Sequence, residues 1–347
     1  MTKMKSSIFL SLLLINIFTF AQEVKVTKVT DKVSVFNLTN VSNCNIVAIS
    51  SVEGIILIDT ETSPMTMEIM KEAIQKEFPA KKFIYVINTH AHTHHCGGNA
   101  VFKDIPIIAH ENIVEDMQWW FEVLADEEMK KKFADYFNNN IAGCEKAIND
   151  KDNRFDAESL KELISYWEKR RQEIENGFEI IIPKIRFSDR MKLHLEDMTM
   201  DLIYYGKGHS KSDILIHIPE EKVLISGAVI IPGLPSTHPK SEKEHEVAHW
   251  ISVLKILNEK LNTIETIIPG HSGLLGKESV KLSYEYFSEM FNRIKDFKNQ
   301  GLSLDEVKQN LSLSKGFSHF AQFKDLSNDE KDRHLENIEV FWNNIKN

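Results

Sequence analysis

The most constraining segment of this chain places four histidines within six residues: His90, His92, His94 and His95. They follow the apolar run 83–87, which has the length and composition of a buried β-strand, and Gly97 and Gly98 end the segment. Neutral imidazole is the commonest metal ligand in proteins. Because a short loop behind a strand must present several of these rings together, we expect a metal site at the end of this strand.

The composition is that of a folded protein without a nucleic-acid surface. Of the 347 residues, 42% are hydrophobic and 27% are charged, which is typical of a globular chain. The formal net charge is -9 at pH 7, whereas nucleic-acid binding requires a basic surface. We therefore expect a small-molecule substrate and no nucleic-acid partner.

The three cysteines are scattered through the chain: Cys44, Cys96 and Cys144. An odd number at these spacings does not form a disulfide framework. We expect small buried residues that fill the core, with one bridge and a spare thiol as the alternative.

The first 21 residues resemble an export signal. Two lysines precede the apolar run 8–20, and Ala21 stands where a small residue is expected at a cleavage point. The alternative is a retained membrane anchor, but the apolar run falls short of the roughly 18 to 20 residues that span a bilayer. We therefore predict a signal peptide over residues 1–21, cleavage near Ala21, a secreted or periplasmic protein, and no stable membrane span.

The first half of the remaining chain reads as a strand meander followed by alternating helices and strands. Apolar or alternating segments predict strands, and a serine-proline pair predicts the start of a helix. Strands are expected at 24–29, 33–38, 45–50, 54–59, 83–88 and 105–109, with a helix at 65–77. Charged, glycine-poor sequence with helical spacing then predicts a helical insertion over about 111–177.

The second half returns to strands and ends in helices. Strands are expected at 178–182, 185–187, 191–195, 198–205, 214–218, 223–225 and 264–268, with a helix at about 243–261. The chain from about residue 279 onwards is charged and helical in pattern.

Two further histidines stand at strand ends in this second half. His209 follows Gly206-Lys-Gly, and His271 follows Pro269-Gly270, so that each comes after an apolar strand and a glycine. This layout presents a side chain at the rim of a sheet. Three strand-end loops therefore have the means to converge on one site.

With these residues in place, the chain resembles the metallo-β-lactamase superfamily. Its loop motif, His-x-His-x-Asp-His followed by Gly-Gly, matches 89–98, and the Gly206–His209 and Pro269–His271 segments follow in the right order. The resemblance covers roughly Val24 to Gly276. It implies an α+β fold, a four-layer αβ/βα sandwich over 22–285 with a helical insertion at about 111–177, and a helical C-terminal extension over 286–347.

The resemblance also assigns metal ligands to two sites. The first would comprise His90, His92 and His209, and the second would include His95 and His271. An imidazole can replace the motif aspartate as a nitrogen ligand, which gives a second site of His94, His95 and His271. The implied cofactor is zinc, as one or two ions, with iron or manganese left open because histidine accommodates several metals.

The sequence departs from the family pattern at two positions. His94 replaces the motif aspartate, which is both a ligand and the residue that orients the attacking hydroxide, so His94 is the candidate catalytic residue. Ala228 stands where many members have a cysteine or aspartate ligand. Asp59 and Asp213 are candidates for fixing the tautomers of ligand rings, with turn and cap roles as the alternative.

The predicted function is an exported, zinc-dependent hydrolase that attacks an ester, lactone, thioester or β-lactam-type substrate with metal-bound hydroxide. In members that hold a β-lactam carboxylate with a lysine, the matching position here is Ile231. The alternative is a catalytically impaired metal-binding protein that retains the fold, which the two departures favour.

Overall fold

The computed structural model describes residues 24–39, 42, 44–150, 156–231, 246–320 and 328–345. They form two compact units, one of residues 127–177 and one that holds the rest. The predicted signal segment 1–21 lies outside the described residues. In the part of the chain that is described, no helix is long and apolar enough to cross a membrane.

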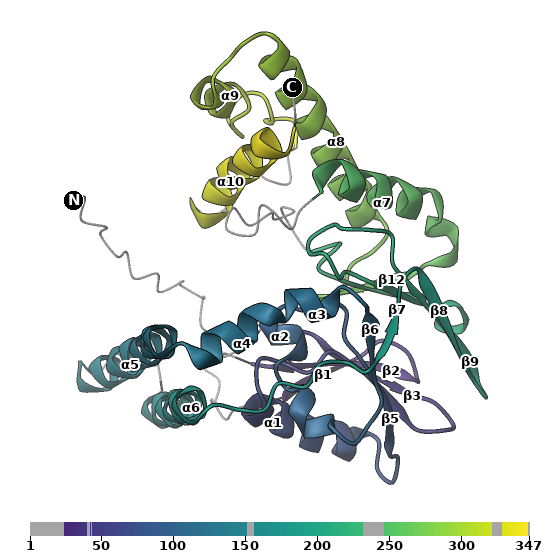
Figure 1. The fold of residues 1–347 in the computed structure, drawn as a ribbon, viewed down its shortest axis with the longest axis vertical. Coiled ribbons are helices and arrows are strands. Elements are labelled where there is room, and N and C mark those ends of the chain that lie inside the picture. The colour runs from purple at the N-terminus through teal and green to yellow at the C-terminus, as the bar shows by residue number, and fades with distance from the viewer. Residues whose placement is uncertain are drawn as a thin grey trace. The chain divides into compact units, whose positions relative to one another are not determined.

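The first sheet of the larger unit consists of seven strands in sequence order among the described residues (Figure 1). β1 to β4 pair antiparallel as a meander, and β4 to β7 pair parallel. The strands are β1 (Val24–Lys28), β2 (Val33–Leu38), β3 (Ile46–Ser50), β4 (Ile55–Ile58), β5 (Phe83–Ile87), β6 (Ile107–His110) and β7 (Ile185–Phe187). Because β4 and β5 are parallel, Asp59 and the histidine loop emerge at the same edge of the sheet.

The second sheet has five strands in the order β12-β11-β10-β9-β8 within the described chain. β8 to β11 pair antiparallel, whereas β11 and β12 are parallel. The strands are β8 (Arg190–Leu195), β9 (Met198–Ile203), β10 (Leu215–Ile218), β11 (Val223–Gly227) and β12 (Thr266–Pro269).

The main core lies between the two sheets. Side chains that alternate along β2, β3 and β4, such as Val47 and Ile58, contact side chains from β9, β10 and β11, such as Leu202 and Ile216. All four are at most 1% exposed, and burial of an aliphatic side chain of this size contributes about 1.5 to 3 kcal/mol. This shared core fixes the loops at the sheet ends relative to one another.

Helices cover the outer face of each sheet. α1 (Pro64–Glu77) packs against β1 and β2, and it begins at Ser63, whose Oγ accepts a hydrogen bond from the Thr66 amide. α7 (Val247–Glu259) and α8 (Glu278–Asn299) cover the second sheet, where Trp250 and Leu254 contact Leu224. The result is an α+β fold, a four-layer αβ/βα sandwich (Figure 1).

The C-terminal extension adds α9 (Leu304–Asn310) and α10 (Asn328–Asn344), which pack with α8 around a buried polar network. The imidazole of His334 lies 2.7 Å from Tyr286 Oη through Nδ1 and 2.8 Å from the Leu311 carbonyl oxygen through Nε2. A carbonyl only accepts, so Nε2 carries the proton and Nδ1 accepts from the tyrosine. Burial lowers the pKa of His334.

The helical insertion lies between α4 (Gln118–Ala125) and β7 in the sequence. Its own unit is a pair of long helices, α5 (Glu127–Asn149) and α6 (Ala157–Asn176). Aromatic residues join the two helices, with the rings of Phe137 and Trp167 stacked at 5.8 Å. These aromatic side chains therefore serve packing within the hairpin.

One predicted strand is wrong. Residues 178–182 form no strand in the described structure; instead Ile180 and Ile182 pack against a small cluster that includes Ala91 and Cys96. The carbonyl of Ile181 accepts a hydrogen bond from the Asn99 side chain rather than from a neighbouring strand. The apolar pattern here therefore reflects burial without β-pairing.

Candidate metal centre

Three loops bring all six candidate histidines together at one rim of the sandwich. The loop after β5, with the short helix α2 (Thr93–Cys96), carries four of them, the β9–β10 loop carries His209, and the turn after β12 carries His271. Ring contacts connect them all: His90, His92, His94, His95, His209 and His271. The rim is therefore built from both sheets.

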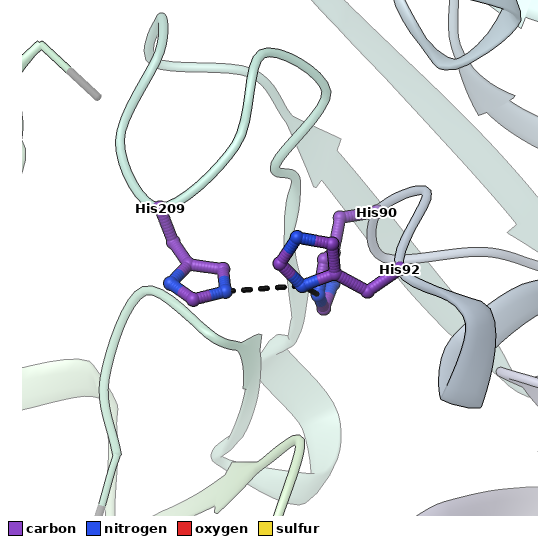
Figure 2. Close-up of side chains that lie close together, drawn as sticks. All are labelled: His90, His92 and His209. Atoms are coloured by element: carbon purple, nitrogen blue, oxygen red, sulfur yellow. Dashed lines mark hydrogen bonds between the residues drawn. The ribbon is translucent and has the colours of Figure 1, made fainter. Parts of the chain in front are cut away.

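Three nitrogens of this cluster converge closely. His92 Nδ1 lies 3.2 Å from His90 Nε2 and 3.2 Å from His209 Nε2 (Figure 2). A zinc ion at about 2.0 to 2.1 Å from tetrahedral nitrogens separates those nitrogens by roughly 3.4 Å. Two of the three separations thus match those of a zinc site, and all three nitrogens lie within 4.8 Å of one another.

A second group of histidines adjoins the first. His95 Nε2 lies 3.2 Å from His271 Nε2, and the His94 ring centroid lies 4.6 Å from that of His271. Nitrogens of His90, His94 and His95 also lie within 4.8 Å of one another, so His90 borders both groups. Within the described residues, both candidate ligand groups consist of imidazoles alone.

Asp59 connects the two groups of histidines through His95 and, by way of Thr89, through His90. Its carboxylate accepts hydrogen bonds from Thr89 N at 2.7 Å and Thr89 Oγ1 at 2.8 Å, and its Oδ2 lies 2.6 Å from His95 Nδ1. Thr89 Oγ1 in turn lies 3.0 Å from His90 Nδ1. With Asp59 ionised, the protons of both rings sit on Nδ1, which leaves both Nε2 lone pairs directed into the cluster.

Burial shapes the charges at this rim. It holds the pKa of His90 and of His95 well below their ordinary range, and the neighbouring histidines add to this effect. Both rings are therefore neutral at pH 7, which is the form that binds a metal. Burial also raises the pKa of Asp59 to about 8, although the hydrogen bonds from Thr89 oppose the shift. A divalent cation nearby favours the ionised carboxylate.

Asp213 stabilises the backbone of the His209 loop. It accepts from the Ser210 amide at 2.7 Å and from Ser210 Oγ at 2.9 Å, and burial raises its pKa to about 7. Asp213 therefore has the contacts of a residue that caps the turn. Of the two aspartate candidates, Asp59 is the one that contacts a ligand ring, that of His95.

A short helix within the predicted helical insertion also contacts the loop that carries His209. α3 (Ile113–Asp116) follows Asn112, whose Nδ2 donates to the Lys211 carbonyl at 2.9 Å, while Asp116 accepts from Ser212 Oγ at 2.7 Å. The partners are 99 and 96 residues apart, so no local pattern indicates them.

Two close approaches explain glycines in the motif loops. A Cβ at Gly97 would clash with the Thr62 carbonyl oxygen, and a Cβ at Gly206, which has a φ of 98°, would clash with the His249 ring. His249 Nε2 donates to the Tyr205 carbonyl oxygen at the base of the same loop. These glycines let the ligand loops lie directly on neighbouring chain segments.

Sequence reasoning missed the surroundings of Cys44. This buried thiol donates to the His94 carbonyl oxygen at 2.9 Å and lies 3.7 Å from His95 Nδ1. Burial raises its pKa well above the ordinary value, so it is a protonated thiol. All three cysteines are free thiols, as the packing interpretation expected.

Ala228 stands where many members of the family have a cysteine or aspartate ligand. Its side chain is buried and has no atom that can bind a metal.

The comparisons with known proteins agree with this geometry. The sequence profile described as the metallo-beta-lactamase superfamily matches residues 39–271. The chain is 23% identical over 299 residues to "Metallo-beta-lactamase type 2" of Elizabethkingia meningoseptica, which covers 83% of this chain and 96% of that protein. Against the protein of the same name from Bacteroides fragilis it is 24% identical, over 29% of this chain and 40% of the other.

Solved structures show the same fold at low identity. A metallo-beta-lactamase from Pontibacter korlensis aligns with a TM-score of 0.52 at 15% identity, over 77% of this chain and 99% of that one. The sec-alkylsulfatase Pisa1 from Pseudomonas sp. aligns with a TM-score of 0.63, also at 15% identity, over 92% of this chain but only 50% of that one.

The fold is a hydrolase-like αβ/βα sandwich with six histidines grouped at one rim. The chain belongs to the metallo-beta-lactamase superfamily.

Proposed function

We propose that this protein is a zinc-dependent hydrolase that binds one or two metal ions at the histidine rim. The observation that carries the proposal is the convergence of three ring nitrogens: His90 Nε2 and His209 Nε2 each lie 3.2 Å from His92 Nδ1. Membership of a superfamily composed mostly of hydrolases supports it.

Each residue has a defined part in this proposal. His90, His92 and His209 hold the first ion, and His94, His95 and His271 hold the second. Zinc held by the first three histidines would supply activation of a water molecule near neutral pH. Asp59 keeps the His95 proton on Nδ1 and, through Thr89, does the same for His90.

His94 makes this centre unlike the family motif. An imidazole supplies a nitrogen ligand but no negative charge, so it does not orient a nucleophile as the aspartate would. This observation favours a second candidate function, a metal-binding protein with impaired catalysis. The retention of the other five ligand histidines in one cluster favours the enzyme.

The proposed substrate is an ester, lactone, thioester or β-lactam. β-Lactams are included because relatives of this chain are named metallo-beta-lactamases. Sulfate esters are added to the test panel because a structural neighbour is named a sec-alkylsulfatase. Ile231 provides no cation for a carboxylate of the substrate.

Export and domain limits complete the proposal. Residues 1–21 would direct secretion or periplasmic export and be removed near Ala21. Residues 22–285 would form the catalytic domain, and 286–347 its helical extension.

The test is metal stoichiometry on the mature protein, purified without a histidine tag, together with hydrolysis of a chromogenic β-lactam, a lactone, small carboxylic esters and a sulfate ester. Close to two metal equivalents with turnover would support a dinuclear hydrolase. Bound metal without turnover on any substrate would favour the impaired metal-binding protein. Absence of metal binding would refute both.

A further inference from the structure

A groove of about 600 Å³ opens beside the turn that carries His271. One wall is the face of β1 and β2 that carries Lys25 and Asn37, and the other is the segment Ser272, Gly273 and Leu274. Ligand sites in proteins occupy roughly 300 to 1,000 Å³, so the groove is large enough for part of a substrate.

Hydrogen bonds connect the groove directly to the metal rim. Asn45 N donates to the Gly270 carbonyl oxygen at 2.8 Å, and its side chain donates to the Ser272 carbonyl oxygen at 2.9 Å. Cys44 forms an isolated β-bridge with His271. The groove therefore begins where the chain leaves the metal ligand.

The length of this path follows from strand spacing. Lys25 pairs with Asn37 across β1 and β2, the Asn37 side chain donates to the Cys44 carbonyl oxygen at 2.9 Å, and Cys44 pairs with His271. Each of these three contacts joins neighbouring segments whose backbones lie about 5 Å apart. The Cα atoms of Lys25 and His271 are therefore separated by roughly 15 Å. The extended side chain of Lys25 shortens the distance between its ammonium group and the metal centre.

The charge of the groove is one-sided. Lys25 is the ionisable side chain among its described lining residues, which otherwise present hydroxyls, one amide and two apolar side chains. No carboxylate of the described chain forms an ion pair with Lys25, whereas Lys28, on the opposite face of the same strand, lies 3.1 Å from Asp31. An exposed lysine without a counter-ion attracts an oxyanion.

We propose that this groove binds the acyl part of a substrate that carries a second, anionic oxygen group, and that Lys25 binds this group while the scissile bond lies at the metal centre. The inference rests on the proposed hydrolase function and narrows its substrate class. It also assigns to Lys25 the anion-binding role that Ile231 does not fill.

The test compares zinc-loaded parent protein with Lys25→Glu and with the matched control Lys28→Glu. Substrates are p-nitrophenyl acetate and the mono-p-nitrophenyl esters of succinic, adipic, suberic and dodecanedioic acids. We expect Lys25→Glu to raise KM for the longer dicarboxylate esters about tenfold with kcat unchanged, since removal of an exposed ion pair alone accounts for roughly two- to fivefold and reversal adds repulsion. The effect should shrink at high salt, and p-nitrophenyl acetate and Lys28→Glu should show no change.

Equal effects of the two variants, or an equal effect on the neutral ester, would overturn the proposal. If the parent protein hydrolyses no ester, the proposed function fails for this class, and calorimetric binding of suberate to the zinc-loaded protein still tests Lys25. Weaker suberate binding by Lys25→Glu alone would support the groove, and unchanged affinity would refute it. Matching thermal unfolding of the three proteins controls for folding.

Discussion

Replacing Asp59 with asparagine should separate zinc affinity from the rest of the fold. Asparagine has the same shape and keeps one acceptor oxygen for the Thr89 amide. Its NH₂ group would then face two donors, Thr89 Oγ1 and His95 Nδ1, which lie 2.8 and 2.6 Å from the carboxylate. The His95 proton would move to Nε2, the nitrogen that faces the metal.

The magnitude follows from these contacts. Loss of a buried partner that orients a ligand ring costs tenfold to a hundredfold in metal affinity, or about 1.4 to 2.8 kcal/mol. With a pKa of about 8, Asp59 is largely protonated in the metal-free protein at pH 7, so the loss of two hydrogen bonds between neutral groups should lower the free energy of unfolding of that form by about 1 to 3 kcal/mol. Thr89→Val removes the hydroxyl contacts with Asp59 and His90 but leaves the contact between Asp59 and His95 in place, so it should have a smaller effect on zinc affinity.

The assay is zinc affinity by competition with a chromophoric chelator, paired with urea unfolding of the metal-free protein. Asp197→Asn is the matched control because Asp197 also accepts several hydrogen bonds, from Ser51 Oγ and the Val52 amide, but contacts none of the six histidines. It should lose about 1 kcal/mol of stability and keep its zinc affinity. An Asp59→Asn protein that binds zinc within twofold of the parent would refute the tautomer argument.

Three further results are expected. His92→Ala should lose the first metal ion and any hydrolysis together, since its Nδ1 lies 3.2 Å from both partner nitrogens; metal analysis beside a turnover assay checks this, and a metal-replete, active variant would reject the ligand assignment. His94→Asp should raise hydrolysis, because it restores a negative charge to the second site; a loss of existing activity would instead give His94 a specialised role. The pKa of His334 is lowered in the fold, so its contribution to stability is complete above the unfolded value of about 6.5 and is lost as pH falls through the folded value. His334→Gln should therefore be less stable at pH 7 by about 1 to 3 kcal/mol, for two altered buried hydrogen bonds, but less sensitive to acid between pH 7 and 5; parallel unfolding curves at both pH values would contradict this.

The strands and the three histidine loops could be predicted because their signals are local. An apolar run of β-strand length followed by glycine and histidine indicates both a buried strand and its rim, as at 83–87 before His90. The segment 178–182 misled the same reasoning, since burial without a pairing partner produces an identical apolar pattern. The pattern of apolar residues indicates which side chains are buried, whereas the pairing of a strand depends on which segment of the chain lies next to it.

The supporting contacts of the site could not be predicted in this way. Asp59 was a candidate because it ends a strand, but its connection to His90 passes through the Thr89 hydroxyl, which carries no sequence signal. The contacts of Asn112 and Asp116 with the His209 loop join positions nearly a hundred residues apart. Such partners are decided by sheet packing rather than by neighbouring residues.

The unequal distribution of the histidines along the chain affects how the protein acquires its metal. Four imidazoles lie within six residues, so the unfolded chain already contains a chelating segment, whereas His209 and His271 arrive only when both sheets have assembled. Zinc that binds the unfolded chain offsets the stabilisation that native binding provides. A chain refolded first and supplied with zinc afterwards should therefore reach full loading sooner than a chain refolded in excess zinc, and the timing of metal supply becomes part of its maturation.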